Sequence, residues 1–353
     1  MAEEPPAGAD PSLRQLLSRT LPRRAAAAVG TSGLPAGAPP RVSAPVDPAF
    51  VRLEGPWRHR EVSANGVRFH VAETGPADPG GAPLVLLLHG FPEFWWSWHH
   101  QLVALGEAGF RAVAVDLRGF GGTDKPPSGY DLPTLAADVA GLVRALGEEQ
   151  AVLVGHDWGG VLAWSAAALH PRVVRGIVPV SMAHLLRFKA AILTQPRGQL
   201  RASGYMAPFQ LLGAERRLLD DDAEAVGALL HRWGGPGFPD AETEELCRKA
   251  AQIPGAAASA MEYYRGALRS LSAPPLRANA LTRRLRRPVA APVLQLHGSD
   301  DPCVLASTAR GSGRWVSGPY AWHEFAGVGH FPHEEQPGRV NDLLIDWLRA
   351  LPA

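Results

Sequence analysis

The segment from Val152 to Gly160 constrains the fold of this chain more than any other stretch. It reads Val-Leu-Val-Gly-His-Asp-Trp-Gly-Gly, so an apolar run ends at polar residues flanked by glycine and then resumes. This pattern predicts a buried strand, a sharp turn and a helix. The small residues let the backbone bend tightly enough for the Asp157 side chain to project from the edge of a sheet.

Further apolar runs predict strands that are covered on both faces. They lie at 84–88, 111–115, 152–154, 176–180 and 293–296, with a last short strand at 322–325. Amphipathic patterns predict helices at 97–105, with Ser97 as N-cap, and at 132–146 and 340–348. Asn65-Gly66 predicts a hairpin between 60–62 and 67–71. The alternation indicates an α/β fold with a mostly parallel sheet flanked by helices.

The 353 residues are enough for one α/β domain that carries an insertion. The alternation stops from about 183 to 287, where the composition is mostly helical, so we predict a helical lid between strands. The core is then expected at 49–182 and 288–353, with folded structure starting near Gly55. Residues 1–48 are rich in Ala, Pro and Gly, and we expect a disordered tail there.

Charge and cysteine content exclude several classes of partner. The formal net charge is +1, and the basic run Thr282–Arg287 is expected to be solvated surface, so no nucleic-acid partner is predicted. Cys247 and Cys303 form neither a disulfide framework nor a metal-binding motif. This is consistent with a reducing compartment, so we predict a cytoplasmic protein. The apolar stretch after Arg23-Arg24 is too short for an export signal, and no run is long enough for a membrane span. The oligomeric state stays open.

Asp157 occupies the centre of the sharp turn, where serine is usual in a nucleophile elbow. A carboxylate with an ordinary pKa of about 3.9 is ionised at neutral pH and needs no base before it attacks. Asp157 is therefore expected to attack a saturated electrophilic carbon and form an ester. The alternative is that Asp157 only caps the following helix.

Hydrolysis of such an ester requires a base for water and a carboxylate that orients the base. We expect the base to be His330, in the loop after the last strand, with His323 and His333 as alternatives. We expect the orienting acid to be Asp301, in the loop after the preceding strand, and Asp300 is the alternative. The Gly-x-x-Asp spacing from Gly298 favours Asp301, and the order nucleophile, acid, histidine is the usual one for this kind of fold.

The ester's tetrahedral intermediate needs backbone N–H groups to hold its negative oxygen. Trp158, which follows the nucleophile, is expected to supply one, and Phe91, in the loop after strand 84–88, the other. The Trp158 side chain can either pack in the core or line the site.

Four motifs in this order resemble those of the α/β-hydrolase-fold epoxide hydrolases. They are His89-Gly90-Phe91-Pro92-Glu93, Gly155-His156-Asp157-Trp158-Gly159-Gly160, Gly298-x-x-Asp301 and Gly329-His330. The similarity extends from about Trp57 to the C-terminus. It implies that an epoxide becomes a vicinal diol through an alkyl ester on Asp157, which His330-activated water then hydrolyses. The partners would be a small epoxide and water, with no cofactor and no metal.

The resemblance also implies two lid tyrosines that donate hydrogen bonds to the epoxide oxygen. The segment 203–210 resembles the one that carries the first, at Tyr205. The second is expected at Tyr264, before Arg265, with Tyr263 as the alternative. Gly213-Ala214 departs from the family's Pro-containing turn, so the substrate pocket is not predicted.

Two other functions remain possible at this point. A haloalkane dehalogenase would use the same aspartate, although its halide site often includes a side-chain amide where this chain has Phe91. A catalytically silent, ligand-binding member of the fold would typically lack one of the catalytic residues, and here each expected residue is present.

Overall fold

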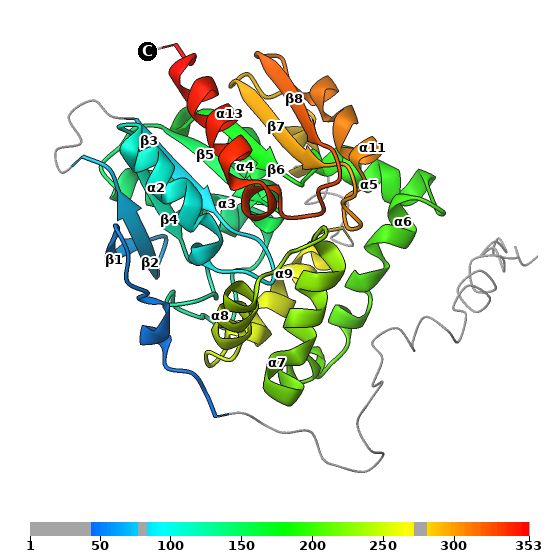
Figure 1. The fold of residues 1–353 in the computed structure, drawn as a ribbon. Helices are drawn as coiled ribbons and strands as arrows, with labels where there is room; N and C mark the ends of the chain where they lie inside the picture. The colour runs from blue at the N-terminus through cyan, green and yellow to red at the C-terminus, as the bar shows by residue number, and fades with distance from the viewer. Residues whose placement is uncertain (1–43, 77–82, 272–280, 353) are drawn as a thin grey trace, which may run out of the picture. The chain divides into compact units, whose positions relative to one another are not determined.

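The computed structural model describes residues 44–76, 83–271 and 281–352, which belong to one compact unit. In this part of the chain, eight strands form one sheet in the order β1-β2-β4-β3-β5-β6-β7-β8 (Figure 1). The strands are β1 (Arg58–Ala64), β2 (Val67–Thr74), β3 (Leu84–Leu88), β4 (Arg111–Val115), β5 (Ala151–His156), β6 (Val174–Val180), β7 (Val293–Gly298) and β8 (Tyr320–Phe325). The predicted α/β fold is confirmed.

The sheet is antiparallel at one edge and parallel elsewhere. β1 and β2 form the predicted hairpin, in which Ala64 pairs with Val67. Asn65 and Gly66 have φ angles of 46° and 75°, as a two-residue hairpin turn with positive φ at both positions requires. β2 also pairs antiparallel with β4, and every pairing from β4 to β8 is parallel.

Helices cover both faces of the sheet, with α2 and α13 in front of it and α3 and α4 behind it in Figure 1. Their bounds are α2 (His99–Glu107), α3 (Leu132–Ala145), α4 (Trp158–Leu169) and α13 (Pro337–Arg349). All residues of β3, β4 and β5 are buried because helices lie on both sides of them. This explains why these strands are continuously apolar rather than alternating.

The described parts of the chain between β6 and β7, up to 271 and from 281, are mostly helical, as predicted. They include α5 (Leu185–Thr194), α6 (Gln199–Ala202), α7 (Ala214–Trp233), α8 (Ala241–Ala251) and α9 (Ala256–Leu271). α9 lies at the carboxyl ends of the strands, because the Tyr264 ring contacts the Phe91 ring in the loop after β3 at a centroid distance of 5.6 Å. The helical segment therefore adjoins the edge of the sheet where Asp157 lies.

Two local predictions near the start of the fold are wrong. Ser97 does not cap α2 but is buried inside the short 3-10 helix η2 (Trp95–Trp98), which runs directly into α2. The burial of Trp95 and Trp98 draws this turn into the core. Folded structure also begins before Gly55, at the 3-10 helix η1 (Pro48–Val51), where the carbonyl of buried Val51 accepts a hydrogen bond from Trp95 Nε1 at 2.8 Å.

Three further predictions concern the N-terminal tail, the basic run and the absence of a membrane span. The tail predicted at 1–48, with Arg23-Arg24, lies almost wholly outside the described residues, which begin at 44. The four arginines of the run 282–287 are exposed, as expected for solvated surface. Among the described residues, no helix is both long and apolar enough to cross a membrane.

Replacing Gly159 by alanine tests the tight packing between α4 and β3. A Cβ at this position would lie 1.9 Å from the Leu88 carbonyl oxygen, so the strand or the helix must shift. Gly159→Ala is expected to lower the free energy of unfolding by about 1–3 kcal/mol or more, measured by urea denaturation.

Gly338→Ala is the matched control, since Gly338 is exposed in α13 and a Cβ there meets no atom within 4 Å. This variant should be neutral or stabilised by about 0.4–1 kcal/mol. Equal stability of Gly159→Ala and the parent would contradict the packing argument.

Candidate active site

Asp157 stands between β5 and α4 with a backbone conformation that is rare outside glycine. Its φ is 46° and its ψ is −111°. A non-glycine residue keeps a positive φ only where its surroundings enforce it. Here they do, because a Cβ at Gly155 would lie 2.1 Å from the Gly159 carbonyl oxygen, so strand and helix approach through bare backbone.

The carboxylate of Asp157 points into the site rather than capping α4. It makes no capping hydrogen bond to the helix, so the interpretation of Asp157 as a mere helix cap is wrong. Instead, Oδ2 accepts a hydrogen bond from the Phe91 backbone N–H at 3.1 Å. Burial raises the pKa of Asp157, while the neighbouring His330 and His156 and the amides of Phe91 and Trp158 act in the opposite direction.

His330 and Asp301 form a buried, well-oriented pair. His330 Nδ1 lies 2.8 Å from Asp301 Oδ2, and Asp301 Oδ1 accepts hydrogen bonds from the backbone N–H groups of Cys303 at 2.7 Å and Val304 at 3.0 Å. With Nδ1 directed at Asp301, Nε2 faces Asp157 Oδ1 at 3.8 Å. Three residues predicted from separate loops thus lie together.

The charge of Asp301 dominates the protonation of His330. Burial of the imidazole favours its neutral form, but the charge and hydrogen bond of Asp301, together with the charge of Asp157, raise the pKa of His330 to about 9. Burial alone would raise the pKa of Asp301, but the charge and the hydrogen bond of His330 bring it below its ordinary value. Asp301 and His330 therefore stabilise each other's charged forms.

The alternatives to these residues lie elsewhere. Asp300 is exposed and accepts a hydrogen bond from Ser299 Oγ at 2.7 Å. His323 is partly exposed on β8. His333 is fully buried but faces Glu93, with Nε2 3.8 Å from Glu93 Oε1.

Tyr205 and Tyr264 lie near Asp157 in the helical segment. Tyr205 belongs to the 3-10 helix η4 (Ser203–Met206), Tyr264 belongs to α9, and their ring centroids are 6.4 Å apart. Burial raises the pKa of each phenol well above its ordinary value, and the charge of Asp157 adds to both shifts. Both hydroxyls therefore stay protonated and can donate hydrogen bonds.

Tyr263 points away from this arrangement. Its hydroxyl donates to the Arg118 carbonyl at 2.9 Å, and its ring is 1% exposed. Trp158 lies between the two neighbouring tyrosines, with ring centroids 5.2 Å from both Tyr263 and Tyr264. The Trp158 side chain thus combines the two roles that the sequence left open, because it is buried and also borders Tyr264.

Glu335 holds the loop that carries His330, a role that the sequence analysis missed. Its Oε2 accepts hydrogen bonds from the N–H groups of Gly329 at 2.8 Å and Gly235 at 3.0 Å, and its Oε1 accepts one from Phe331 at 3.0 Å. Glu335 therefore ties both neighbours of His330 to the chain just after α7. The sequence offers no signal for this, since an acid in a short helix is usually solvated.

Trp233 completes this connection. Its carbonyl accepts a hydrogen bond from the His330 N–H at 2.8 Å, and its ring lies 4.8 Å from that of Tyr205. Tyr205 and Trp233 also line a surface pocket, so the site borders on solvent at this point. The remaining residues of the pocket are Arg197, Gly198, Arg201, Ala202, Arg232, Pro302 and Leu305.

Comparisons with known proteins give the family of this chain. A family model described as the alpha/beta hydrolase fold matches residues 83–337. Epoxide hydrolase A of Mycobacterium tuberculosis is 31% identical over 316 residues, which cover 83% of this chain and 97% of the relative. An AB hydrolase superfamily protein of Bacillus subtilis is 30% identical, with coverage of 82% and 96%. The crystal structure of epoxide hydrolase A from Mycobacterium thermoresistibile has a TM-score of 0.69 at 30% identity and covers 84% of this chain and 99% of its own.

Replacing Glu335 by glutamine tests the clamp on the His330 loop. The neutral amide accepts through only one oxygen, so all three backbone N–H groups lose a charged partner and at least one of them loses its acceptor altogether. A hydrogen bond to a charged group contributes about 1.5–3 kcal/mol to stability. We therefore expect Glu335→Gln to lower the free energy of unfolding by a similar amount. We also expect it to slow turnover, because the loop that carries His330 is held less firmly.

Glu242→Gln is the control, because Glu242 is exposed at the start of α8. It should change stability by less than about 0.5 kcal/mol, as surface substitutions usually do. Urea denaturation and steady-state turnover measure both variants, and a Glu335→Gln protein that matches the control would contradict the clamp.

Proposed function

This chain belongs to the epoxide hydrolases of the α/β-hydrolase fold, and we propose that it acts through a covalent ester on Asp157. The observation that carries the proposal is the position of the Asp157 carboxylate. One of its oxygens accepts a hydrogen bond from the Phe91 amide, and the other faces His330. Each oxygen thus has a partner suited to a different step of the reaction.

In the first step, Asp157 Oδ1 attacks a ring carbon of the epoxide. A C–O ester bond forms while the strained ring C–O bond breaks, and its electron pair moves to the epoxide oxygen. Tyr205 and Tyr264 donate hydrogen bonds to that oxygen, and one of them supplies the proton that converts the alkoxide to a hydroxyl. Neutral phenols suit this task because an alkoxide is a poor leaving group without a donor.

In the second step, His330 Nε2 takes a proton from water, and the water oxygen attacks the ester carbon of Asp157. The negative charge of the tetrahedral intermediate develops on Oδ2, where the amides of Phe91 and Trp158 stabilise it. Collapse breaks the bond between the ester carbon and the alkoxide oxygen, and the alkoxide takes the proton from His330 and leaves as the diol. The water oxygen stays in the Asp157 carboxyl group, whose remaining proton returns through solvent to the tyrosine that was deprotonated in the first step. The 3.8 Å between Nε2 and Oδ1 exceeds a direct hydrogen bond and suits a water held by Nε2.

Ester formation itself prepares His330 for this step. The negative charge of Asp157 contributes to the raised pKa of His330, which disfavours a neutral imidazole before the substrate reacts. Alkylation turns Asp157 into a neutral ester and removes that contribution. The pKa of His330 therefore falls when a general base is needed, and Asp301 continues to orient the ring.

We also propose that residues 183–287 form a lid over a core of residues 49–182 and 288–353. Support comes from Tyr205, Tyr264 and Trp233, which belong to the helical segment and lie against the site. A haloalkane dehalogenase would employ the same aspartate, but two protonated phenols near Asp157 suit a developing alkoxide better than a halide.

A single turnover in ¹⁸O-labelled water tests the covalent route. With enzyme in excess over a simple epoxide such as styrene oxide, we expect the first diol to contain only ordinary oxygen, since its new oxygen comes from Asp157. The label should instead appear in the Asp157-containing peptide, as mass spectrometry would measure. Labelled diol in the first turnover would exclude the ester.

His330→Gln provides the complementary measurement. Loss of the base should reduce turnover by about 10²–10⁴-fold, while ester formation continues. The intact protein should therefore gain the mass of one epoxide molecule. An Asp157→Asn protein, checked for spontaneous deamidation, should not gain this mass.

Phenylalanine substitutions distinguish the two neighbouring tyrosines of α9. Tyr264→Phe removes a hydroxyl near Asp157, and we expect ring opening to slow by about 10²–10⁴-fold, the range for a lost acid or base. Tyr263→Phe removes a hydroxyl that donates to the Arg118 carbonyl. It should lower stability by about 1–3 kcal/mol and leave the ring-opening rate nearly unchanged. Stopped-flow measurement of the alkylation phase separates these outcomes, and the reverse pattern would assign the role to Tyr263.

A further inference from the structure

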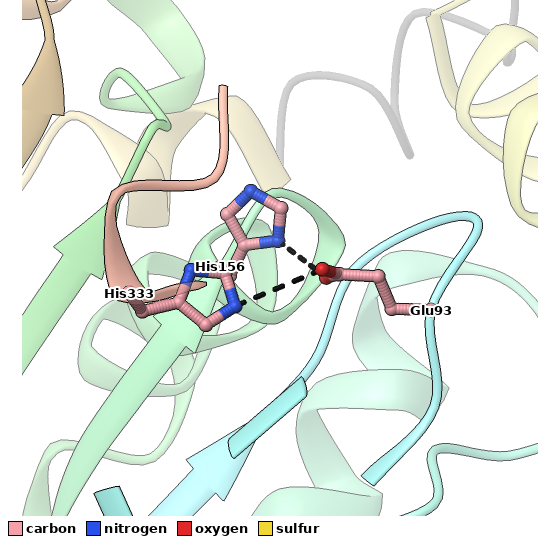
Figure 2. Close-up of side chains that lie close together, drawn as sticks. All are labelled: Glu93, His156 and His333. Carbon is pink, nitrogen blue, oxygen red and sulfur yellow. Dashed lines mark hydrogen bonds and ion pairs between the residues drawn. The ribbon is translucent and has the colours of Figure 1, made fainter. Parts of the chain in front are cut away.

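A second cluster of polar side chains lies buried behind Asp157, and the proposed mechanism does not use it. Glu93, His156 and His333 are each at most 1% exposed. Figure 2 shows both imidazole rings with a nitrogen turned toward the Glu93 carboxylate. His156 Nδ1 lies 2.8 Å from Glu93 Oε2, and His333 Nε2 lies 3.8 Å from Glu93 Oε1.

Protein hydrogen bonds leave this cluster incompletely satisfied. Glu93 Oε1 and both ring nitrogens of His333 are buried without a hydrogen-bond partner. Unpartnered buried polar atoms are rare because each costs about 1–3 kcal/mol. Since Glu93 Oε1 and His333 Nε2 face each other, one additional species between them would satisfy both.

The hydrogen bond on the far side of His156 matches that of a metal ligand. His156 Nε2 lies 2.8 Å from the His330 carbonyl oxygen, and a carbonyl can only accept, so Nε2 carries the hydrogen. Nδ1 lies 2.8 Å from Glu93 Oε2, so without a metal ion this hydrogen bond needs a second proton on the ring, and a bound ion would take the place of that proton. Histidines that bind metals usually donate their other N–H in this way to a carbonyl or carboxylate.

The spacing of the donor atoms fits a small divalent ion. One donor atom from each of Glu93, His156 and His333 lies within 4.8 Å of the other two. Ligands about 2.1 Å from a tetrahedral zinc ion are about 3.4 Å apart. The two imidazole nitrogens lie at similar distances from the two Glu93 oxygens, 2.8 Å from His156 Nδ1 to Oε2 and 3.8 Å from His333 Nε2 to Oε1. Two imidazole nitrogens with one carboxylate suit zinc and similar transition metals better than magnesium or calcium.

We propose that Glu93, His156 and His333 bind one divalent transition-metal ion of the zinc class. The sequence contains no motif for such a site, because the three ligands come from distant parts of the chain. Each ligand lies within three residues of a residue of the reaction: Glu93 follows Phe91, His156 precedes Asp157, and His333 follows His330. The ion would hold these three segments together from behind the site and take no part in the reaction, so the proposal is independent of the covalent route.

Metal binding to the tag-free full-length protein tests this proposal. After treatment with a chelator and its removal, the protein is titrated with Co²⁺ and, separately, with Zn²⁺. We expect one equivalent to bind, visible Co²⁺ absorption bands typical of four- or five-coordination, and a rise in Tm with Zn²⁺. Absence of both the bands and the Tm rise in the unmodified protein would overturn the proposal without recourse to variants.

Three variants distinguish the proposed ligand set from a competing one. His333→Gln should weaken Co²⁺ binding at least tenfold, whereas His323→Gln, on β8, should bind like the parent. Cys303→Ser tests a competing set, since Asp301, Cys303 and His330 also place donor atoms within 4.8 Å of one another. Loss of binding in Cys303→Ser but not in His333→Gln would assign the metal to that set and contradict the proposal. Circular dichroism of the chelator-treated proteins separates a lost ligand from a lost fold.

Discussion

The contact between bare backbones at the turn around Asp157 is the constraint on which the rest of the structure depends. Gly155 of β5 has no room for a Cβ because α4 lies against it, and Gly159 of α4 has none because β3 lies against it. Asp157 is held at a positive φ between these two glycines. This strain directs the carboxylate away from the helix that it precedes and toward the amide of Phe91. The loops after β3, β7 and β8 lie at the same edge of the sheet as Asp157, because these strands and β5 belong to the parallel part of the sheet.

Balance of charge among buried groups explains why these loops carry two aspartates and a histidine. Asp157, Asp301 and His330 are all buried, so each carboxylate is stabilised in its charged form by His330, and the charged imidazole is stabilised by the two carboxylates. Asp301 is further held by two backbone amides, which fixes the direction of the His330 ring. The site is thus arranged before a substrate arrives, and the amide of Phe91 is in place before any charge develops beside it.

Much of this arrangement could be predicted from the sequence because it depends on local patterns. The strands follow from continuous apolar runs, the hairpin from Asn65-Gly66, and the positions of Asp301 and His330 from loops at a common sheet edge. Ser97 was assigned wrongly because the burial of neighbouring tryptophans outweighed its capping preference. Glu335 and the Glu93 cluster could not be predicted, since their partners are backbone groups or side chains far away in the chain.

The bonds around Glu335 and Trp233 also fix where the helical segment is attached. Its junction after α7 is joined to the His330 loop by the Gly235 and His330 amides, so a shift of this junction would displace His330. The opposite part, α5 to η4, carries Tyr205 and borders the surface pocket. That part is fastened as well, because Gln199 donates a hydrogen bond to the Cys303 carbonyl at 2.7 Å and accepts one from the Leu305 N–H at 3.0 Å. The helical segment is therefore held by the Asp301 loop on one side of the site and by the His330 loop on the other.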